Sequence, residues 1–264
     1  MTRQKSGWLD ALFLAVLAGY ILAGTALVPF HGDESTTIWM SRDYGFIFLD
    51  GELDRVRYQE SPVSATEQHM RLITGSLTKY LIGFSWHLNG YTTAQINEQW
   101  DWGADWHYNQ TTGHAPDDRL LMLGRWPSAL MLAAGVVVLF GIGRMLGGRG
   151  VAYVACLYYA LNPALLLNGR RAMFEGGLVL FSLLTVLVAI WLLRRRSWRA
   201  AIALGLCSGL ALAAKHPAGF TLVAVFGAGM VYSWQEADRW RLVGKLVVAA
   251  TLALLVFCAL HPQW

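Results

Sequence analysis

Apolar residues gather into seven long blocks along this chain, separated by shorter polar segments. The blocks cover residues 8–28, 120–143, 151–168, 172–193, 200–214, 217–233 and 243–260. At a rise of about 1.5 Å per residue, about 20 apolar residues cross a hydrocarbon layer of about 30 Å. We therefore predict an all-α integral membrane protein with about seven transmembrane helices. The first block exceeds the roughly 7–15 apolar residues of a secretory signal, so we interpret it as a span.

A long polar segment, residues 29–118, separates the first two blocks. Within it, residues 71–88 are apolar but interrupted by Lys79, Trp86 and His87, a pattern typical of a helix at the membrane surface. We predict a single membrane domain over residues 1–264, with this segment as a large loop that carries interfacial helices. The chain stops directly after the seventh block, which indicates a piece of a longer protein, truncated at its C-terminus.

Charged residues determine the predicted orientation in the membrane. Only 14% of the residues are charged and 55% are hydrophobic, which leaves too little polar surface for a soluble domain. The long loop holds five basic and thirteen acidic residues, whereas the short segments at the other side are rich in Arg and Lys. By the positive-inside rule, the N-terminus is cytoplasmic and the loop lies on the outer face, as in a bacterial cytoplasmic membrane. This topology explains the net charge of +4 without nucleic acid as a partner.

An acidic pair, Asp33 and Glu34, directly follows the first predicted span. A carboxylate at the boundary between water and headgroups is partly desolvated, which raises its basicity, so it could take a proton from an acceptor hydroxyl. The alternative is an ordinary acidic pair that caps a helix, continued by Ser35 and Thr36. Adjacent residues point in different directions, so we do not expect both carboxylates to face one substrate.

Basic residues gather on the loop side of the later spans. Arg170 and Arg171 precede Glu175 at the fourth span, and the spacing of Arg171 and Glu175 places both on one face of a predicted helix. Arginine on the outer side opposes the positive-inside trend and favours a local anion such as phosphate. Lys215 and His216, in the hairpin between the fifth and sixth spans, would extend this basic rim toward a lipid phosphate or pyrophosphate. Alternatively, these charges only reach the interface from the ends of spans.

Two pairs of loop residues could contribute to a divalent metal site. Glu67 and His69 are one pair, and His31 with Asp33 is the other. Neither pair has the multi-ligand spacing of a metal motif, so the sequence leaves the metal open.

The loop also contains a segment, residues 100–108, that is dense in aromatic and acidic residues. Trp102 and Asp105 could contact a sugar or an acceptor, because rings stack on pyranose faces and carboxylates bind hydroxyls. Glu67 and His69 are further candidates for such contacts. The alternative is an aromatic belt at the outer membrane interface.

Four motifs, taken in order, carry a resemblance to a known family. They are residues 31–34 after the first predicted helix, 125–128 at the second, 168–176 at the fourth and 209–216 ending the fifth. Together they resemble the GT-C superfamily of glycosyltransferases. Within it, the chain is most similar to family 39, the protein O-mannosyltransferase-like or phospholipid carrier-dependent enzymes. The resemblance covers essentially the whole chain and corresponds to the N-terminal seven-helix module.

This resemblance implies transfer of a sugar from a polyprenyl-phosphate donor to an acceptor hydroxyl on the outer face, with inversion. Asp33 would be the general base, with Glu34 beside it. Arg171 and Lys215 would hold the donor phosphate, and Glu175 would match the family's second acidic position. The sugar and the acceptor, whether a protein, a lipid or a glycan of the cell envelope, stay open, as does any need for a metal.

Two other functions compete with this interpretation. A transporter or flippase-like protein tends to place charged or helix-breaking residues at mid-membrane depth, whereas these spans are nearly free of charge. A non-catalytic membrane assembly protein would use the loop as a protein-binding surface. The concentration of charged residues at the outer rim favours chemistry at the interface.

Overall fold

The structure is a computed structural model that describes residues 2–263, with side chains from residue 7 onward. Arg3 and Lys5, which entered the predicted topology, have side chains outside this described part. All regular secondary structure within residues 2–263 is helical, with no strand, so the predicted all-α class is confirmed.

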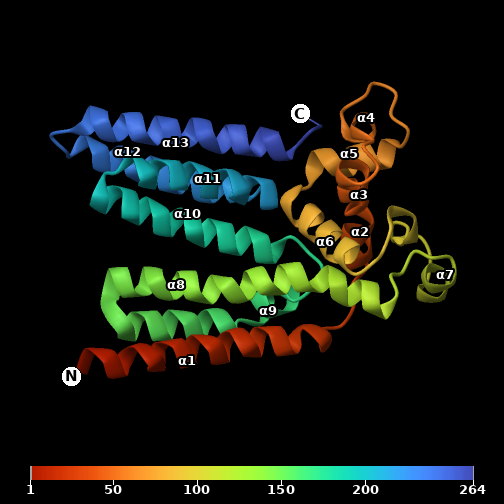
Figure 1. Cartoon of the computed structure of the whole chain (residues 1–264), viewed down its shortest axis with the longest axis horizontal. Coiled ribbons are helices and arrows are strands. Elements are labelled where there is room, and N and C mark those ends of the chain that lie inside the picture. Colours follow the sequence, from red (N-terminus) through yellow and green to blue (C-terminus); the bar gives the residue numbers. More distant parts are fainter. Residues whose placement is uncertain (1, 264) are drawn as a thin grey trace.

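Six apolar helices form an elongated bundle (Figure 1). Four are long and apolar enough to cross a membrane, and two are shorter apolar helices that lie beside them. The long ones are α1 (Thr2–Ala23), α8 (Asp118–Leu161), α10 (Glu175–Arg195) and α13 (Arg239–Leu260), and the shorter ones are α11 (Trp198–Ala214) and α12 (Ala218–Trp234). The chain is thus an integral membrane protein. The N-terminus lies at one end of the bundle, and the C-terminus lies at the other end, called the loop end below.

Helix α8 consists of two antiparallel arms joined at Gly148 (Figure 1). Gly148 has φ 78° and ψ −167°, in the region that glycine adopts at low cost, so the chain reverses there. The predicted spans 120–143 and 151–168 correspond to these arms, but the second arm ends at Leu161. The side chain of Asn162 then caps a separate helix, α9 (Pro163–Gly169). Proline lacks an N–H and is favoured at the first position of a helix, which explains the break.

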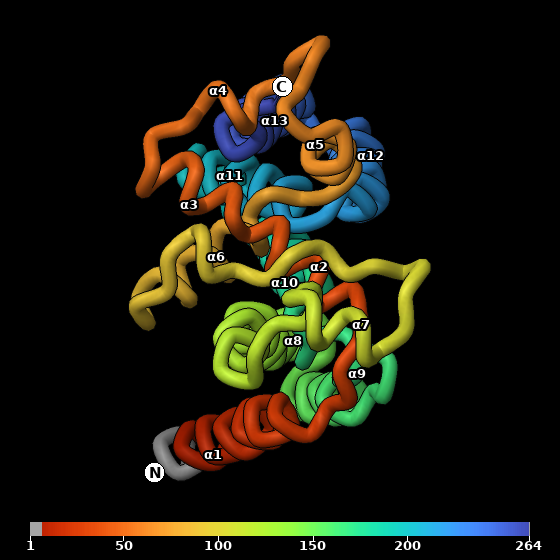
Figure 2. The backbone as a smooth tube through the Cα atoms, turned by 90° about the vertical axis from the view of Figure 1, so that its right-hand side faces the viewer, coloured from red at the N-terminus to blue at the C-terminus, as the bar shows by residue number. Residues whose placement is uncertain are grey.

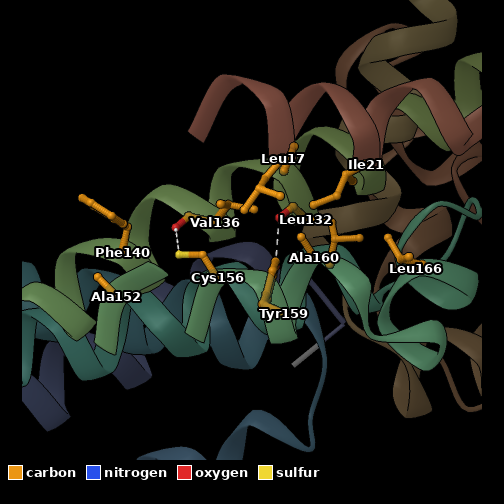
Figure 3. Close-up of a cluster of buried hydrophobic side chains, with 11 residues drawn as sticks. Leu17, Ile21, Leu132, Val136, Phe140, Ala152, Cys156, Tyr159, Ala160 and Leu166 are labelled. Atoms are coloured by element: carbon orange, nitrogen blue, oxygen red, sulfur yellow. Dashed lines mark hydrogen bonds between the residues drawn. The ribbon is translucent and has the colours of Figure 1, made fainter. Parts of the chain in front are cut away.

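The first core joins α1 to the two arms of α8 (Figure 3). Leu17 and Ile21 of α1 pack against Leu132 and Val136 of the first arm, and all four are buried. Tyr159, on the second arm, donates a hydrogen bond from its hydroxyl to the carbonyl of Leu132 at 2.8 Å. This contact satisfies the one polar atom that the ring carries into the core.

The second core lies on the other side of α10 and joins it to α11 and α13. Its buried residues include Leu192 of α10, Leu204 of α11 and Leu246 of α13. Viewed from the loop end, α10 separates α1 and α8 on one side from α11, α12 and α13 on the other (Figure 2). The two cores meet along this central helix, which begins at the loop end with Glu175.

The segment between α1 and α8 folds over the loop end as a set of short helices (Figures 1 and 2). They are α2 (Gly32–Met40), α3 (Arg42–Phe48), α4 (Leu53–Val56), α5 (Ala65–Ile73), α6 (Leu77–Leu88) and α7 (Trp106–Thr111), with single 3-10 turns at Gly24–Ala26 and Thr93–Gln95. The predicted interfacial helix over residues 71–88 is broken between α5 and α6. There, a Cβ on Gly75 would lie 2.2 Å from the carbonyl oxygen of Ala214, so the backbone itself packs on the end of α11.

Candidate active site

An open cavity of about 260 Å³ lies at the loop end, where four elements converge. Its lining comes from α2, the end of α5, the segment that leads into α10, and the end of α11. The residues that line it are Asp33, Thr36, Thr37, Met40, Met70, Thr74, Met173, Phe174, Glu175 and Lys215. The cavity therefore brings together three of the charged residues that the sequence analysis selected, from three separate parts of the chain.

Asp33 lies in the first turn of α2, directly after the chain leaves α1. Its side chain is 55% exposed, and it reaches the cavity. The ring of His31 caps this helix, because Nδ1 accepts a hydrogen bond from the backbone N–H of Asp33 at 3.2 Å. The cap from His31 thus fixes the backbone at the start of α2, and this backbone holds the exposed carboxylate of Asp33.

Glu175 and Lys215 form an ion pair at the same cavity, with Nζ and Oε1 2.5 Å apart. Glu175 is the first residue of α10, and Lys215 directly follows the last turn of α11. Oε2 of Glu175 is buried and has no protein partner in the described part of the chain, and the same holds for Oγ1 of Thr36. Buried polar atoms normally have a hydrogen-bond partner, so these two atoms favour a polar ligand in the cavity.

Glu34 points away from the cavity and is fully buried. Its carboxylate accepts two hydrogen bonds from Arg125, Nε to Oε2 and Nη2 to Oε1, both at 2.8 Å. It also accepts the backbone N–H groups of His31, at 3.1 Å, and of Ala172, at 3.0 Å. Glu34 therefore holds the first turn of α2 against the segment before α10. Asp33 and Glu34 point in different directions, as adjacent residues of a helix must.

Arg170 and Arg171 lie in the non-helical segment between α9 and α10. Arg170 donates from Nε to the carbonyl of Ile21 at 2.8 Å and from Nη2 to that of Tyr20 at 2.6 Å, near the C-terminal end of α1. Arg171 is buried and donates from Nε to the carbonyl of Pro29 at 3.1 Å. Neither guanidinium lines the cavity.

The predicted helical pairing of Arg171 with Glu175 is wrong, because α10 begins only at Glu175. The N–H of Ala172 bonds to Glu34 instead of joining a helix, so residues 171–174 take a bent path. As a result, Lys215 is the cation that meets Glu175.

Glu67 belongs to a buried ion network at the loop end, not to the cavity. Its Oε2 accepts from Nη2 of Arg71 at 2.9 Å, and Arg71 also donates from Nε to Asp43 at 2.8 Å. Lys79, only 1% exposed, lies 3.5 Å from the other oxygen of Asp43. Burial lowers the pKa of Lys79, and the nearby Asp43 carboxylate opposes this shift.

The two candidate metal pairs do not converge. Glu67 and His69 lie on α5, where Glu67 is engaged by arginines and His69 is exposed. His31 and Asp33 lie at the start of α2. Within the described residues, no three His, Cys, Asp or Glu side chains gather as ligands for a metal ion.

The aromatic segment lies beside His31. Trp102 is 62% exposed, and its ring centroid is 5.8 Å from that of His31. Trp100 and Trp106 pack against Phe30 in the same cluster. Asp105 caps α7, since its Oδ1 accepts the N–H of Tyr108 at 2.8 Å. A contact with sugar or acceptor stays a prediction for both Trp102 and Asp105.

His216 follows Lys215 but does not line the cavity. Its ring lies against those of Phe257 and His261, with centroids 6.0 and 5.8 Å away. Burial lowers the pKa of His216, and the positive charge of Lys79 acts in the same direction. A neutral imidazole is a poor ligand for phosphate, which argues against His216 as a residue that holds the donor. That role stays a prediction.

Sequence reasoning missed several residues of the site. Met40, Met70 and Met173 line the cavity, but single methionines in apolar or mixed segments give no local signal. Arg125 belongs to one of the four motifs and lies near the start of a predicted span. A single arginine at that position indicates that an acidic partner is needed, and the structure shows that this partner is Glu34.

One comparison with known proteins identifies a family for the chain. The model of the dolichyl-phosphate-mannose-protein mannosyltransferase family matches residues 65–261, about three quarters of the chain. A search of curated proteins found no match. The matched range contains the Glu175–Lys215 pair and begins after Asp33. The chain therefore belongs to the dolichyl-phosphate-mannose-protein mannosyltransferase family and has the family's character of a membrane glycosyltransferase.

Proposed function

We propose that this protein moves a sugar from a polyprenyl-phosphate carrier to an acceptor hydroxyl, with inversion at the anomeric carbon. The observation that carries the proposal is the cavity itself, which is lined by both Asp33 and the Glu175–Lys215 pair. A base and a cation that face one space are the two groups this reaction requires.

Lys215 is proposed to hold the donor phosphate. Its ammonium group has three N–H donors, and its side chain is 34% exposed while one donor meets Glu175. The remaining donors can bind phosphate oxygens as negative charge accumulates on the leaving group. Glu175 keeps the ammonium group at the cavity, and its buried Oε2 has no partner among the described residues.

Asp33 is proposed to accept the proton of the acceptor. The acceptor oxygen forms its bond to the anomeric carbon while the bond from that carbon to the phosphate oxygen breaks. The electron pair of the broken bond leaves with the phosphate, and the hydroxyl proton passes to the carboxylate of Asp33. In-line displacement requires acceptor and phosphate on opposite faces of the sugar, so the proposal requires the sugar to lie between Asp33 and Lys215.

We place the loop end on the outer face of the membrane. Arg144, Arg149, Arg194 and Arg195 lie at the opposite end of the bundle, in the hairpin of α8 and at the end of α10. Positive residues in short connections favour the cytoplasmic side. The donor would then enter the cavity from the outer half of the bilayer, and the acceptor would approach past the exposed ring of Trp102.

The proposal is tested with the full chain reconstituted in lipid vesicles and a panel of polyprenyl-phosphate sugars. Asp33→Asn should lower turnover by on the order of 10²- to 10⁴-fold, the usual contribution of a general base. Asp118→Asn is the matched control, because Asp118 is exposed and lies outside the cavity. Equal turnover of the two variants would remove Asp33 from the mechanism, and absence of transfer with every donor would contradict the proposed function.

A further inference from the structure

Arg170 binds the end of α1 through backbone carbonyls. Its guanidinium donates to the carbonyls of Tyr20 and Ile21, in the last turn of the helix, at 2.6 and 2.8 Å. Carbonyls at a helix end lack intrahelical partners and carry partial negative charge, so they attract a cation. A Cβ on Gly24 would overlap the guanidinium, so the glycine leaves room for this contact. The end of α1 therefore supplies negative charge to an arginine that lies on the loop side of the bundle.

The next two residues bind the rest of the connection between α1 and α2. Arg171 is buried and donates to the carbonyl of Pro29 at 3.1 Å. The N–H of Ala172 donates at 3.0 Å to Glu34, which lies in the first turn of α2 beside Asp33. Residues 28–31 belong to no helix, so groups from elsewhere in the chain must hold them. Residues 170–172 thus bind three successive points: the end of α1, the middle of the connection and the start of α2.

The same segment continues into the ion pair of the cavity. Glu175 follows Ala172 by three positions and begins α10, where it pairs with Lys215. Residues 171–174 are buried, so neighbouring elements enclose this segment. One buried segment therefore connects the backbone beside the proposed base, Asp33, to the pair that contains the proposed cation.

We propose that Arg170 and Arg171 are positioning residues, which act on sugar transfer through the backbone that carries Asp33. The inference rests on the proposed function, in which Asp33 takes the proton of the acceptor hydroxyl. Transfer requires base and cation to be placed together around one sugar, and a misplacement of about 1 Å can cost about 100-fold in rate. Loss of either arginine frees the connection, so Asp33 shifts relative to Lys215 while the phosphate keeps its cation.

The experiment is a double-mutant cycle on transfer in vesicles, with Arg171→Met, Asp33→Asn and the variant that carries both changes. We expect Arg171→Met to lower kcat by about 10- to 100-fold when Asp33 is present. When Asp33 is replaced, the same change should cost less than about threefold, because residues that act through one another are not additive. Arg171→Lys can still donate to the carbonyl of Pro29 and should restore part of the loss. Equal losses in both backgrounds would overturn the inference and favour direct contact of Arg171 with the donor phosphate.

Gly24→Ala displaces Arg170 without removing a charge. The three atoms nearest to a Cβ at this position all belong to the guanidinium, the end of a flexible side chain that can move. Gly19→Ala is the matched control on α1, because a Cβ there meets no atom within 4 Å. We expect kcat to fall in Gly24→Ala and to stay at the wild-type value in Gly19→Ala. Equal turnover of these two variants would contradict the role of Arg170.

A second readout does not depend on activity: the rate of backbone amide hydrogen exchange over residues 24–34. Arg171→Met should speed exchange in this range and leave exchange in α12 unchanged. Unchanged exchange over residues 24–34 would contradict the inference even if the proposed function holds. Faster exchange without transfer from any donor would contradict the proposed function alone.

Discussion

Two charge clusters lie next to each other at the loop end, and both touch Met40. In the open cluster, the side chains of Asp33, Glu175 and Lys215 are 55%, 27% and 34% exposed. In the closed cluster, those of Asp43 and Arg71 are 8% and 6% exposed. The two clusters use the same kinds of residue, and what differs is access to solvent.

This difference in solvent access separates a cluster that can bind a ligand from one that stabilises the fold. In the closed cluster, Arg71 binds two carboxylates and also donates from Nη1 to the carbonyl of Arg55 at 3.0 Å. Its own carbonyl accepts from Gln263, beyond the end of α13, at 2.9 Å. Such a network ties α3, α5, α6 and the C-terminal segment together, with the charges of Asp43, Glu67 and Arg71 paired inside the protein. In the open cluster, the partly exposed ammonium group of Lys215 keeps donors available beside a cavity.

The largest expected effect on stability comes from Asp43→Ala. The change leaves Lys79 and Arg71 buried with unbalanced positive charge, and breaking a buried ion pair costs roughly 3–5 kcal/mol. The thermal unfolding midpoint in detergent should fall by roughly 10 °C for a chain of this size. Asp54→Ala is the control, because Asp54 is 89% exposed and its ion pair is worth about 1 kcal/mol or less. Equal midpoints for the two variants would contradict the assigned role of the closed cluster.

A pH effect should appear where the closed cluster meets the end of α13. Burial lowers the pKa of His261 to about 4, against about 6.5 for a free histidine. Between these values the unfolded chain binds a proton that the folded chain excludes. Stability is therefore complete above about pH 6.5 and falls as the pH drops toward 4, by about 3 kcal/mol in total.

The measurement is the unfolding midpoint at pH 7 and pH 5. His261→Gln should show a smaller drop between these two values than wild type, since the titrating ring is gone. His107→Gln, exposed on α7, should behave as wild type. An identical drop in the unfolding midpoint of all three proteins would show that the pH effect does not come from His261.

A smaller effect, on activity alone, is expected from Lys215→Met. A hydrogen bond to a charged group is worth roughly 1.5–3 kcal/mol, so kcat/KM should fall by about 10- to 100-fold. The unfolding midpoint should change little, because Glu175 and Lys215 are both partly exposed. Lys215→Arg keeps the charge and should retain more activity than Lys215→Met. Wild-type kcat/KM in Lys215→Met would separate this residue from the donor phosphate.

Local patterns predicted part of the candidate site. The position of Asp33 after a span and that of Lys215 in a hairpin were readable because the end of an apolar block marks where polar chemistry can begin. The divergence of Asp33 and Glu34 followed from helix geometry. In the sequence, Lys79 interrupts a predicted interfacial helix. In the structure it is fully buried against Asp43, because burial depends on partners elsewhere in the chain.

The sequence by itself determined the class of the molecule: helical, embedded in a membrane, with a polar loop after the first span and a family resemblance carried by four motifs. Only the tertiary structure decided which charges meet. Lys215 pairs with Glu175 across 40 positions and Glu34 with Arg125 across 91, distances over which helical periodicity carries no information. The bent segment before α10 moved Arg171 out of the expected pairing and left Lys215 in its place. Helices follow from local hydrogen bonds and apolar pattern, whereas a site depends on how their ends come together.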